Sequence, residues 1–451
     1  MGVSSLLRLT VVDHGPLGTM CARLGCMPSK AVLHAGARAA TMRRLAGDHV
    51  VDDSLRQQLW ADVRAFRDRM AGGAADSTRK NLGERLVCGR ARFVDAQTID
   101  VDGRPIRARA FVVPVGSAPV VPKPFETLCD LALTTDSLFE LATLPHSLGV
   151  IGAGTIGIEM GLALARLGFE VTVGDQAKAV AGIADEEISS RAAARFGQEV
   201  RLWLGEEVTA SREGDRVRMS SGTNNVLVER LLVAVGRAPS LAALALDHAG
   251  VKLDPRGRID IDPASLRCGE TTVFVAGDAS SDRPLLHEAK DEGVIAARHA
   301  AAFVDGRTAP PIERRTKLSI VFSDPDIGSI GVALRDLDPA TTVVGTAKGS
   351  DNGRSILLGE ESSLIRLYAD RNDGRLRGAT VFCAGGEHIA HLLAWAVQRG
   401  DTLATLLQLP YYHPTVEEAV LSALRDAAEQ LSDPPDCSGL HERGRMGEAT
   451  G

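Results

Sequence analysis

A chain of 451 residues is too long for a single hydrophobic core, so its length predicts two to four domains. With 44% hydrophobic and 24% charged residues, its composition is that of an ordinary globular protein. The net charge of −7, without a basic block, argues against nucleic acid as a partner.

No segment has the apolarity of a membrane span, because glycines and Glu159 interrupt the most apolar stretch, 148–165. The first residues lack the long apolar core of a secretory signal, so a cytoplasmic enzyme is the default prediction. Seven cysteines are too few for a disulphide scaffold. Five of them are expected to be buried or incidental thiols: Cys88, Cys129, Cys268, Cys383 and Cys437.

Two early stretches resemble two later ones, which indicates a repeated dinucleotide-binding unit. VVPVGSAP (112–119) resembles VAVGRAP (233–239), and LTVVD (9–13) resembles VTVGD (171–175). Gly236, in VAVGRAP, is a candidate for nucleotide contact. The second copy is predicted to be complete, with a strand at 148–151, a glycine turn at 152–157, a helix at 158–167 and a strand at 170–174.

The first copy is predicted to lack its opening. Gly152 precedes Asp175 by 23 residues, and counting 23 residues back from Asp13 reaches a point before Met1. We therefore expect the first strand, glycine loop and helix of this copy to be absent from the chain.

From residue 314 the pattern changes to an α+β module. Its predicted strands are 319–322, 363–369 and 376–382, and its predicted helices are 388–398 and 415–430. After Ser432 the sequence is polar and rich in glycine and proline, which predicts a disordered tail.

Cys21 and Cys26 lie five residues apart in GTMCARLGCMPSK (18–30). An ideal helix would place their Cα atoms about 8–9 Å apart, and a disulphide needs less than about 7 Å. The segment must therefore be distorted to form a disulphide, which Gly25 and Pro28 permit. Spacing alone leaves two alternatives, unrelated thiols and half of a metal site, and the second fails because no further Cys or His pair has ligand spacing.

The same segment resembles GGTCxNxGCxPSK, the redox signature of the pyridine nucleotide-disulphide oxidoreductases. The resemblance implies that Cys21 exchanges with substrate and that Cys26 contacts the flavin as a thiolate. It also implies that Lys30 lies by the flavin ring. The segment departs from the signature at three positions, Thr19, Met20 and Arg23. Met20 replaces a threonine that helps to hold the cofactor in the family.

GAGTIG (152–157) is the candidate site for the second nucleotide. Gly152, Gly154 and Gly157 let the backbone approach a pyrophosphate, whose charge the following helix N-terminus stabilises. Asp175 can accept from both ribose hydroxyls and would repel a 2′-phosphate, so NAD is predicted rather than NADP. A glycine turn that only packs two elements is the alternative.

Four acidic residues and one histidine complete the cofactor candidates. In TTVFVAGDA (271–279) a strand runs into Gly277 and Asp278, and the resemblance implies that Asp278 binds the ribityl and phosphate region of FAD. It implies that Asp13 holds the adenosine ribose, and that Glu159, otherwise an exposed helical acid, approaches the nicotinamide. His287 and Glu288 would lie near the isoalloxazine, although a structural role is equally open for the histidine.

YYHPTVEEAV (411–420) resembles the C-terminal HPTxxE signature of the same family. The resemblance implies that His413 is the general base and that Glu418 orients it, with the pair reaching the disulphide of the other subunit of a homodimer. The alternatives are a surface histidine and a helix start at Pro414, where Thr415 and Glu418 would form a capping box.

The motifs follow the family's order over residues 9–431. They predict an α/β fold with two Rossmann-like dinucleotide-binding domains, the first truncated at its N-terminus, and a C-terminal α+β dimerisation domain. The expected boundaries are 1–139 and 268–313 for the flavin domain, 140–267 for the NAD domain, 314–431 for the interface domain and 432–451 for the tail.

The implied activity is electron transfer from a dithiol through the cysteine pair and FAD to NAD. The PSK ending of the redox motif and the lack of a paired-cysteine tail favour dihydrolipoamide, free or on a lipoyl domain, over glutathione or mercuric ion. One alternative is a related enzyme with another disulphide substrate. The other follows from the missing front: a catalytically silent dimer that cannot hold FAD.

Overall fold

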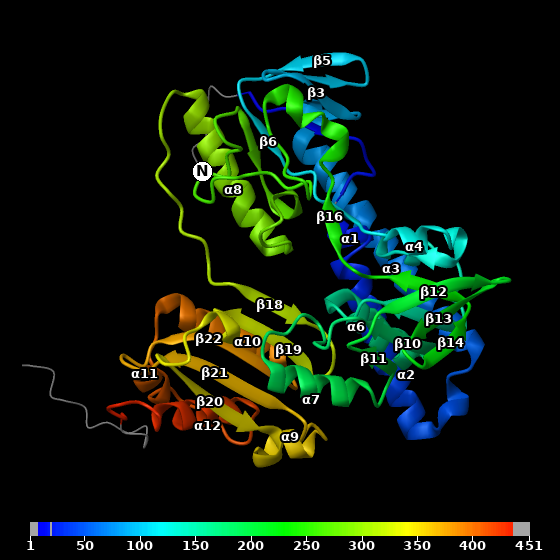
Figure 1. The fold of residues 1–451 in the computed structure, drawn as a ribbon, viewed down its shortest axis with the longest axis vertical. Coiled ribbons are helices and arrows are strands. Elements are labelled where there is room, and N and C mark those ends of the chain that lie inside the picture. The colour runs from blue at the N-terminus through cyan, green and yellow to red at the C-terminus, as the bar shows by residue number, and fades with distance from the viewer. Residues whose placement is uncertain (1–7, 19, 436–451) are drawn as a thin grey trace, which may run out of the picture. The chain divides into compact units, whose positions relative to one another are not determined.

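The protein is described here by a computed structural model that covers residues 8–18 and 20–435 (Figure 1). Thr19, Cys437 and most of the predicted tail, 436–451, lie outside the described residues. The chain divides into two compact units. The first comprises 1–148, 210–219 and 227–314, and the second comprises 149–209, 220–226 and 315–451.

The first unit contains the redox segment and the flavin motifs. Its helices are α1 (Met20–Arg23), α2 (Cys26–Ala46), α3 (Asp53–Leu82), α4 (Lys123–Glu126), α5 (Thr135–Leu138) and α8 (Leu286–Val304), with short 3₁₀ turns at 48–50, 83–85, 129–131, 242–244, 246–249 and 277–280. Its strands are β1 (Val11–Asp13), β2 (Leu86–Cys88), β3 (Ala91–Asp95), β4 (Thr98–Val101), β5 (Arg104–Arg107), β6 (Phe111–Val113), β7 (Ser117–Pro119), β8 (Ala132–Leu133), β15 (Arg230–Val233), β16 (Arg237–Pro239) and β17 (Val273–Val275).

The strands of the first unit form small sheets. β1 pairs with β2, β6 with β17 and β8 with β15, all in parallel, whereas β7 pairs with β16 in antiparallel fashion. β3, β4 and β5 form an antiparallel meander. The side chains of β17 alternate between two cores: Val273 and Val275 pack with Phe93, while Phe274 packs against Ile295 of α8.

Helices α2 and α3 pack on each other and support the redox segment, because α1 packs on both of them. Asp52 caps α3 by accepting a hydrogen bond from the backbone N–H of Leu55. Buried side chains then recur at helical spacing at Trp60, Val63 and Arg67. The indole of Trp60 donates to the carbonyl oxygen of Leu141 over 2.9 Å, which anchors this face of α3.

The second unit begins with a strand–turn–helix–strand segment. β9 (Ser147–Ile151) leads into α6 (Thr155–Leu167) and then β10 (Glu170–Asp175), and α7 (Glu186–Phe196) and β11 (Arg201–Leu204) follow. β10 lies between β11 and β9. The elements predicted for the second copy of the repeat are therefore confirmed. Three strands follow that form one sheet, β12 (Val208–Glu213), β13 (Arg216–Ser221) and β14 (Asn224–Val228). Their residues are divided between the two units.

The rest of the second unit is a five-stranded antiparallel sheet covered by helices (Figure 1). In sheet order its strands are β18 (Leu318–Val321), β19 (Asp326–Gly331), β22 (Leu376–Cys383), β21 (Leu364–Asp370) and β20 (Thr342–Lys348). Its helices are α9 (Gly353–Leu357), α10 (Gly386–Arg399), α11 (Leu403–Leu407) and α12 (Glu417–Ala428), with short turns at 334–336 and 349–351. The α+β module predicted from residue 314 is thus confirmed.

The two faces of this sheet bury different groups. On one face α10 and α12 pack over an aliphatic core that includes Ile365, Val381 and Leu393. On the other face the Tyr368 hydroxyl donates to the buried carboxylate of Asp185, the N-cap residue of α7, over 2.7 Å. Among the described residues, no helix is long and apolar enough to cross a membrane.

Candidate active site

The redox segment is a broken helix. The short helix α1 ends at Arg23, and α2 begins at Cys26, after Gly25 adopts a non-helical conformation with φ −130° and ψ −115°. Cys21 therefore belongs to one helix and Cys26 to the next. The five-residue spacing required such a distortion, and Gly25 is where it occurs.

The two thiols are in contact. Both cysteines are free thiols, and the Cys21 side chain hydrogen-bonds with that of Cys26. This bond and burial raise the pKa of Cys21 well above its ordinary value, against the opposing effect of the backbone N–H groups of Cys26 and Met27. Cys26 is the first residue of a 21-residue helix, where a negative charge is favourable. The arrangement suits a Cys26 thiolate next to a protonated Cys21.

An ion-pair network ties the redox turn to the long helix α3. Arg23 of α1 pairs with Glu140 over 2.8 Å, and Glu140 pairs with the buried Arg67 of α3 over 3.0 Å. Arg67 also donates to the carbonyl oxygen of Phe139 over 2.7 Å. Sequence reasoning did not find Glu140 or Arg67, because neither lies in a recognisable motif.

The flavin motif at the end of β17 is held by side chains from elsewhere in the same unit. Asp278 accepts a hydrogen bond from the Ser117 hydroxyl over 2.6 Å. The backbone N–H of Gly277 donates to Glu292 over 2.7 Å, and Glu292 also pairs with Arg314 over 2.8 Å. Burial raises the pKa of Glu292. Glu292 was missed, although it lies one helical turn beyond Glu288, which is itself buried.

The neighbouring candidates in LLHEA differ in their surroundings. Glu288 is buried and pairs with Arg283 over 3.0 Å and with Arg314 over 2.9 Å, whereas His287 is exposed. The arginines lower the pKa of Glu288 although burial acts against them. Glu288 is thus committed to ion pairs, which favours its structural role.

Three further cofactor candidates, Asp13, Lys30 and Gly236, come from β1, α2 and the turn before β16. Asp13 ends β1 and accepts from the N–H of Gly15 over 2.7 Å. Lys30 lies in the second turn of α2. Gly236 has φ +122°, and no atom lies within 4 Å of where a Cβ would be, so the backbone there is open to a ligand. Asp278, Lys30 and the thiol pair offer the groups expected at the ring and ribityl end of a flavin, and Asp13 offers the carboxylate expected at its adenosine ribose.

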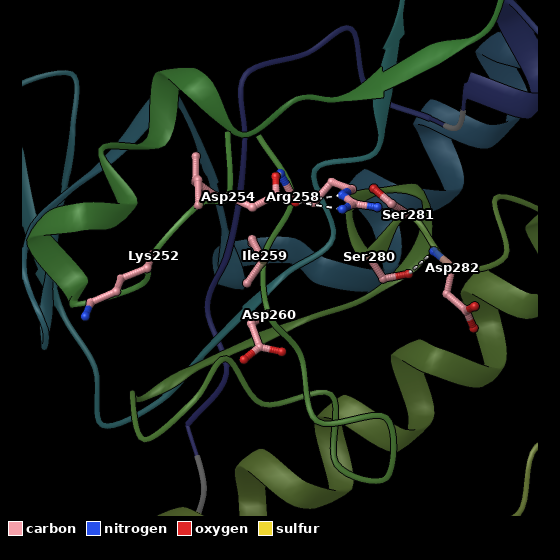
Figure 2. Close-up of a pocket in the computed structure, with 9 residues that line it drawn as sticks. Lys252, Asp254, Arg258, Ile259, Asp260, Ser280, Ser281 and Asp282 are labelled. Carbon is pink, nitrogen blue, oxygen red and sulfur yellow. Dashed lines mark hydrogen bonds and ion pairs between the residues drawn. The ribbon is translucent and has the colours of Figure 1, made fainter. Parts of the chain in front are cut away.

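One pocket of the first unit, of about 510 Å³, borders this motif without containing any predicted site residue (Figure 2). It lies between residues 252–260 and 280–282, directly after Asp278. Asp254 and Arg258 in its lining pair with each other over 2.8 Å. In Figure 2 Lys252 and Asp260 point away from Ser280, so the polar side chains do not converge on one point.

The NAD candidates are brought together by the β9–α6–β10 segment. Asp175 accepts from the N–H of Ala153 over 2.7 Å and from that of Ala177 over 2.8 Å. A Cβ on Gly157 would lie 1.8 Å from the carbonyl oxygen of Gly152, so the helix can approach the strand only at glycine. A Cβ on Gly154 would meet nothing within 4 Å, which leaves space at the helix N-terminus for a phosphate. The segment fits a dinucleotide.

Glu159 is not the exposed helical acid that was the alternative for it, because only 3% of it is accessible. Its carboxylate accepts a hydrogen bond from the backbone N–H of Phe322 over 3.0 Å. Two turns further along α6, Arg166 donates to the carbonyl oxygens of Ser323 and Asp324 over 2.8 and 3.0 Å. Helix α6 is therefore fastened to the segment between β18 and β19.

His413 and Glu418 form a hydrogen-bonded pair in the second unit. The Nδ1 atom of His413 lies 3.0 and 3.1 Å from the two carboxylate oxygens of Glu418, and this contact lowers the pKa of Glu418. The imidazole is 80% exposed, so Nε2 faces outward. Asn352, which sequence reasoning missed, is buried and donates to the carbonyl oxygen of Thr415 over 3.1 Å.

The capping box that was the alternative for Thr415 and Glu418 does not form. Helix α12 starts at Glu417 with Val416 as its N-cap residue, and no side chain caps it. Glu418 does accept from the N–H of Thr415 over 3.1 Å, but the Thr415 hydroxyl donates to the carbonyl oxygen of Tyr412 instead. Because the HPT segment forms its own turn before the helix, Glu418 is left to face His413.

Comparison with known proteins agrees with this geometry. Residues 4–293 match the family described as pyridine nucleotide-disulphide oxidoreductase, and residues 318–424 match the dimerisation domain of the same family. The chain belongs to this family. The predicted mixed α/β fold is confirmed, and so is the prediction of FAD and NAD, the cofactors of the family. The protein is a flavoprotein disulphide oxidoreductase.

Two curated relatives match over nearly their whole length. The dihydrolipoyl dehydrogenase of Thermus scotoductus is 30% identical over 92% of this chain and 91% of its own. That of Haloferax volcanii is 29% identical over 93% of this chain and 91% of its own.

Two solved structures share the fold. LpdA from Mycobacterium tuberculosis has a TM-score of 0.77 and 24% identity over 93% of this chain and 94% of its own. The HOCl-induced flavoprotein disulfide reductase RclA from Escherichia coli has a TM-score of 0.78 and 20% identity, with the same two shares covered.

Proposed function

We propose that this flavoprotein is a dihydrolipoyl dehydrogenase, which oxidises a dihydrolipoyl dithiol and reduces NAD⁺. The observation that carries the proposal is the thiol pair in contact across the helix break, with Cys26 at the start of α2. A dithiol substrate needs an enzyme disulphide with which to exchange, and these are the two thiols that can form it. The dihydrolipoyl dehydrogenases that match over nine-tenths of their length support this choice of substrate.

The exchange of sulphur bonds proceeds in two steps. One thiolate of the substrate attacks the sulphur of Cys21 in the Cys21–Cys26 disulphide, which forms a mixed disulphide and releases Cys26 as a thiolate. The second substrate thiol then closes on the first, which releases the oxidised substrate and leaves Cys21 as a thiol. Two electrons have passed to the cysteine pair, and FAD, for which Asp278 and Lys30 are the candidate contacts, would supply the redox chemistry that links the pair to NAD⁺.

His413 is the base that we propose for the first step. It takes one proton of the dithiol, and the other proton passes from the second substrate thiol to Cys21 when the mixed disulphide is broken. The carboxylate of Glu418 at Nδ1 orients the ring and stabilises its protonated form, so Nε2 is the atom that accepts the proton. Because the dyad is exposed, we propose that it acts on the cysteine pair of a second copy in a homodimer, which the matched dimerisation domain supports.

A first experiment tests whether the chain is a working flavoenzyme. We expect purified protein to carry FAD, seen in its visible absorption, and to reduce NAD⁺ with dihydrolipoamide. A folded but colourless dimer would favour the silent alternative. A yellow protein that oxidises only other dithiols would favour the alternative substrate.

The cytoplasmic location stays a prediction from the sequence.

A second experiment tests the sharing of the active site between copies. Cys21→Ser and His413→Gln are each expected to be inactive, but a dimer with one copy of each has one intact site. Random pairing makes half of the dimers heterodimers, and each heterodimer has one intact site out of two. Co-expression should therefore restore about a quarter of the wild-type rate. Co-expression of Cys21→Ser with Cys26→Ser is the control and should restore nothing. Equal rates in both mixtures would contradict the shared site.

A further inference from the structure

Arg237 makes more side-chain bonds around the redox and flavin residues than any candidate that the motifs named. It is the first residue of β16, and 17% of its side chain is exposed. All three of its nitrogens donate. The acceptors are Ser117 Oγ at 3.0 Å, Ser117 O at 2.8 Å, Met20 Sδ at 3.0 Å, Thr135 Oγ1 at 3.1 Å and Asp136 Oδ1 at 3.4 Å.

Two of these bonds lead to residues that matter for the chemistry. Met20 directly precedes Cys21 on α1. Ser117 accepts from Arg237, and its hydroxyl donates a hydrogen bond to the carboxylate of Asp278 over 2.6 Å. One guanidinium thus connects the start of the redox helix to the acid of the flavin motif, within the same unit of the chain.

The repeated sequence explains how Arg237 comes to lie there. Ser117 and Arg237 occupy the same position in the two related segments, VGSAP and VGRAP. These segments form the antiparallel strands β7 and β16, in which Ala118 lies opposite Ala238. The two equivalent side chains are therefore brought together by the pairing of the repeats.

We propose that Arg237 is a positioning residue that holds the Cys21 helix and the flavin-binding acid in one fixed arrangement. The proposal rests on the proposed function for the roles of Cys21 and Asp278. Only an arginine can do this, because its planar group offers five N–H donors in fixed directions. Its guanidinium is bonded to Met20, the residue before Cys21, and we expect its permanent charge there to favour the thiolate form of the pair. Asp136, at 3.4 Å, is the carboxylate that pairs with this charge.

The experiment measures the alkylation rate of the reduced cysteine pair by iodoacetamide at neutral pH, with Cys21 and Cys26 resolved by mass spectrometry. We expect Arg237→Met to slow alkylation about 10-fold, which corresponds to a change of one pKa unit in the thiolate equilibrium. Arg237→Lys keeps the charge but loses the planar set of N–H donors, so we expect it to slow alkylation less, about 3-fold. A wild-type rate in Arg237→Met would overturn the proposal.

The control is Arg230→Met on neighbouring β15. Arg230 donates only to the carbonyl oxygen of the adjacent Glu229, at 2.7 Å, among the hydrogen bonds that the structure gives it. We expect its alkylation rate to be unchanged. An equal loss in Arg230→Met and Arg237→Met would show a general effect of removing an arginine, and would also overturn the proposal.

Met20→Leu keeps the test decisive if Arg237→Met fails to fold. Met20 is 38% exposed, so the substitution should be tolerated, yet it removes the sulphur acceptor. We expect Met20→Leu alone to slow alkylation about 2-fold. Added to Arg237→Lys or Arg237→Met it should slow alkylation no further, because substitutions of two residues in contact do not have additive effects. Strictly additive effects would contradict the link between the two side chains.

The outcome is independent of catalysis. Alkylation needs neither substrate nor nucleotide, so the role of Arg237 can hold even if dihydrolipoamide proves not to be the substrate. FAD content gives a second readout: Ser117→Ala and Arg237→Met should lower the ratio of flavin to protein, and the double variant should lower it no further. Unchanged flavin content in both single variants would remove the flavin half of the proposal.

Discussion

The NAD motif of the second unit occupies one continuous stretch, from β9 through α6 to Asp175, whereas the redox and flavin residues of the first unit come from segments as far apart as Met20 and Asp278. In the continuous stretch the covalent chain itself sets the geometry, and glycines provide the close contact of strand and helix. In the assembled region the geometry depends on side-chain bonds from Ser117, Arg237 and Glu292. The two regions should therefore respond differently to mutation.

The largest expected effect falls on the assembled region. Cys26→Ser or Cys21→Ser should lower the rate of NAD⁺ reduction by dihydrolipoamide by about 1,000-fold or more, because a single sulphur cannot form the exchanging disulphide. Steady-state assays measure this. Cys88→Ser, at another exposed cysteine, is the matched control and should keep the wild-type rate. Substantial activity in Cys26→Ser would place the chemistry elsewhere.

The continuous region offers a matched pair of glycines. Gly157→Ala should destabilise the protein by about 2–4 kcal/mol, because its Cβ would lie 1.8 Å from a carbonyl oxygen. Gly154→Ala has open space and should melt like the wild type, but should raise KM for NAD⁺ about 10-fold because the methyl group faces the phosphate. Thermal melting and kinetics separate the two, and the reverse pattern would contradict the assignment.

Glu292 tests how far the flavin motif depends on a distant side chain. Glu292→Ala leaves the N–H of Gly277 and the guanidinium of Arg314 without this buried acceptor, at a cost of about 1–3 kcal/mol. Flavin content should fall with it. Glu292→Gln keeps an oxygen that can accept from the N–H of Gly277, so its flavin content should lie between those of the wild type and Glu292→Ala. If Glu292→Ala bound FAD as the wild type does, the motif would be as self-contained as the NAD motif.

The smallest expected effect is on the pH dependence of thermal stability, through the carboxyl group of Glu360. Burial raises the pKa of Glu360 to about 7, with Arg195 and Arg166 acting against it and Asp324 and Glu199 adding to it. Because the folded pKa is above the unfolded value, Glu360 stabilises the protein most below about pH 4.5, and this contribution is lost as pH rises through 7. Glu360→Gln should therefore raise Tm at pH 8 by about 2–5 °C and leave it unchanged at pH 5.

A melting series from pH 5 to pH 8 checks this expectation. Asp326, whose pKa burial raises to about 6, is the companion group, and Asp326→Asn should act in the same direction at a lower pH. A Glu360→Gln curve parallel to that of the wild type would mean that Glu360 does not titrate in this range.

The sequence predicted the local parts of this architecture and missed the contacts between them. The glycine motif could be found from its strand, turn and helix pattern, and the cysteine pair and Asp278 could be found because each lies in a short run that resembles a signature of the family. Arg237, Ser117 and Glu140 could not, because their function depends on which distant segments meet. One signal was present: the VGSAP and VGRAP repeat placed Ser117 and Arg237 at equivalent positions before their strands were known to pair.

The capping box that was the alternative at Thr415 shows what a short motif leaves open. Thr415 and Glu418 have the right spacing, but the turn formed by His413 and Pro414 delays the helix to Glu417. The spacing of a motif does not say which of two hydrogen-bond arrangements the backbone adopts.

Helix α6 has a consequence that reaches beyond the nucleotide site. Glu159 and Arg166 lie two turns apart on it and hold three successive residues, Phe322, Ser323 and Asp324. A tilt of this helix on binding of a dinucleotide at its N-terminus would be transmitted through these bonds to the segment between β18 and β19. If that movement alters the association of two copies, linkage requires the association to alter the affinity for NAD⁺ by the same factor.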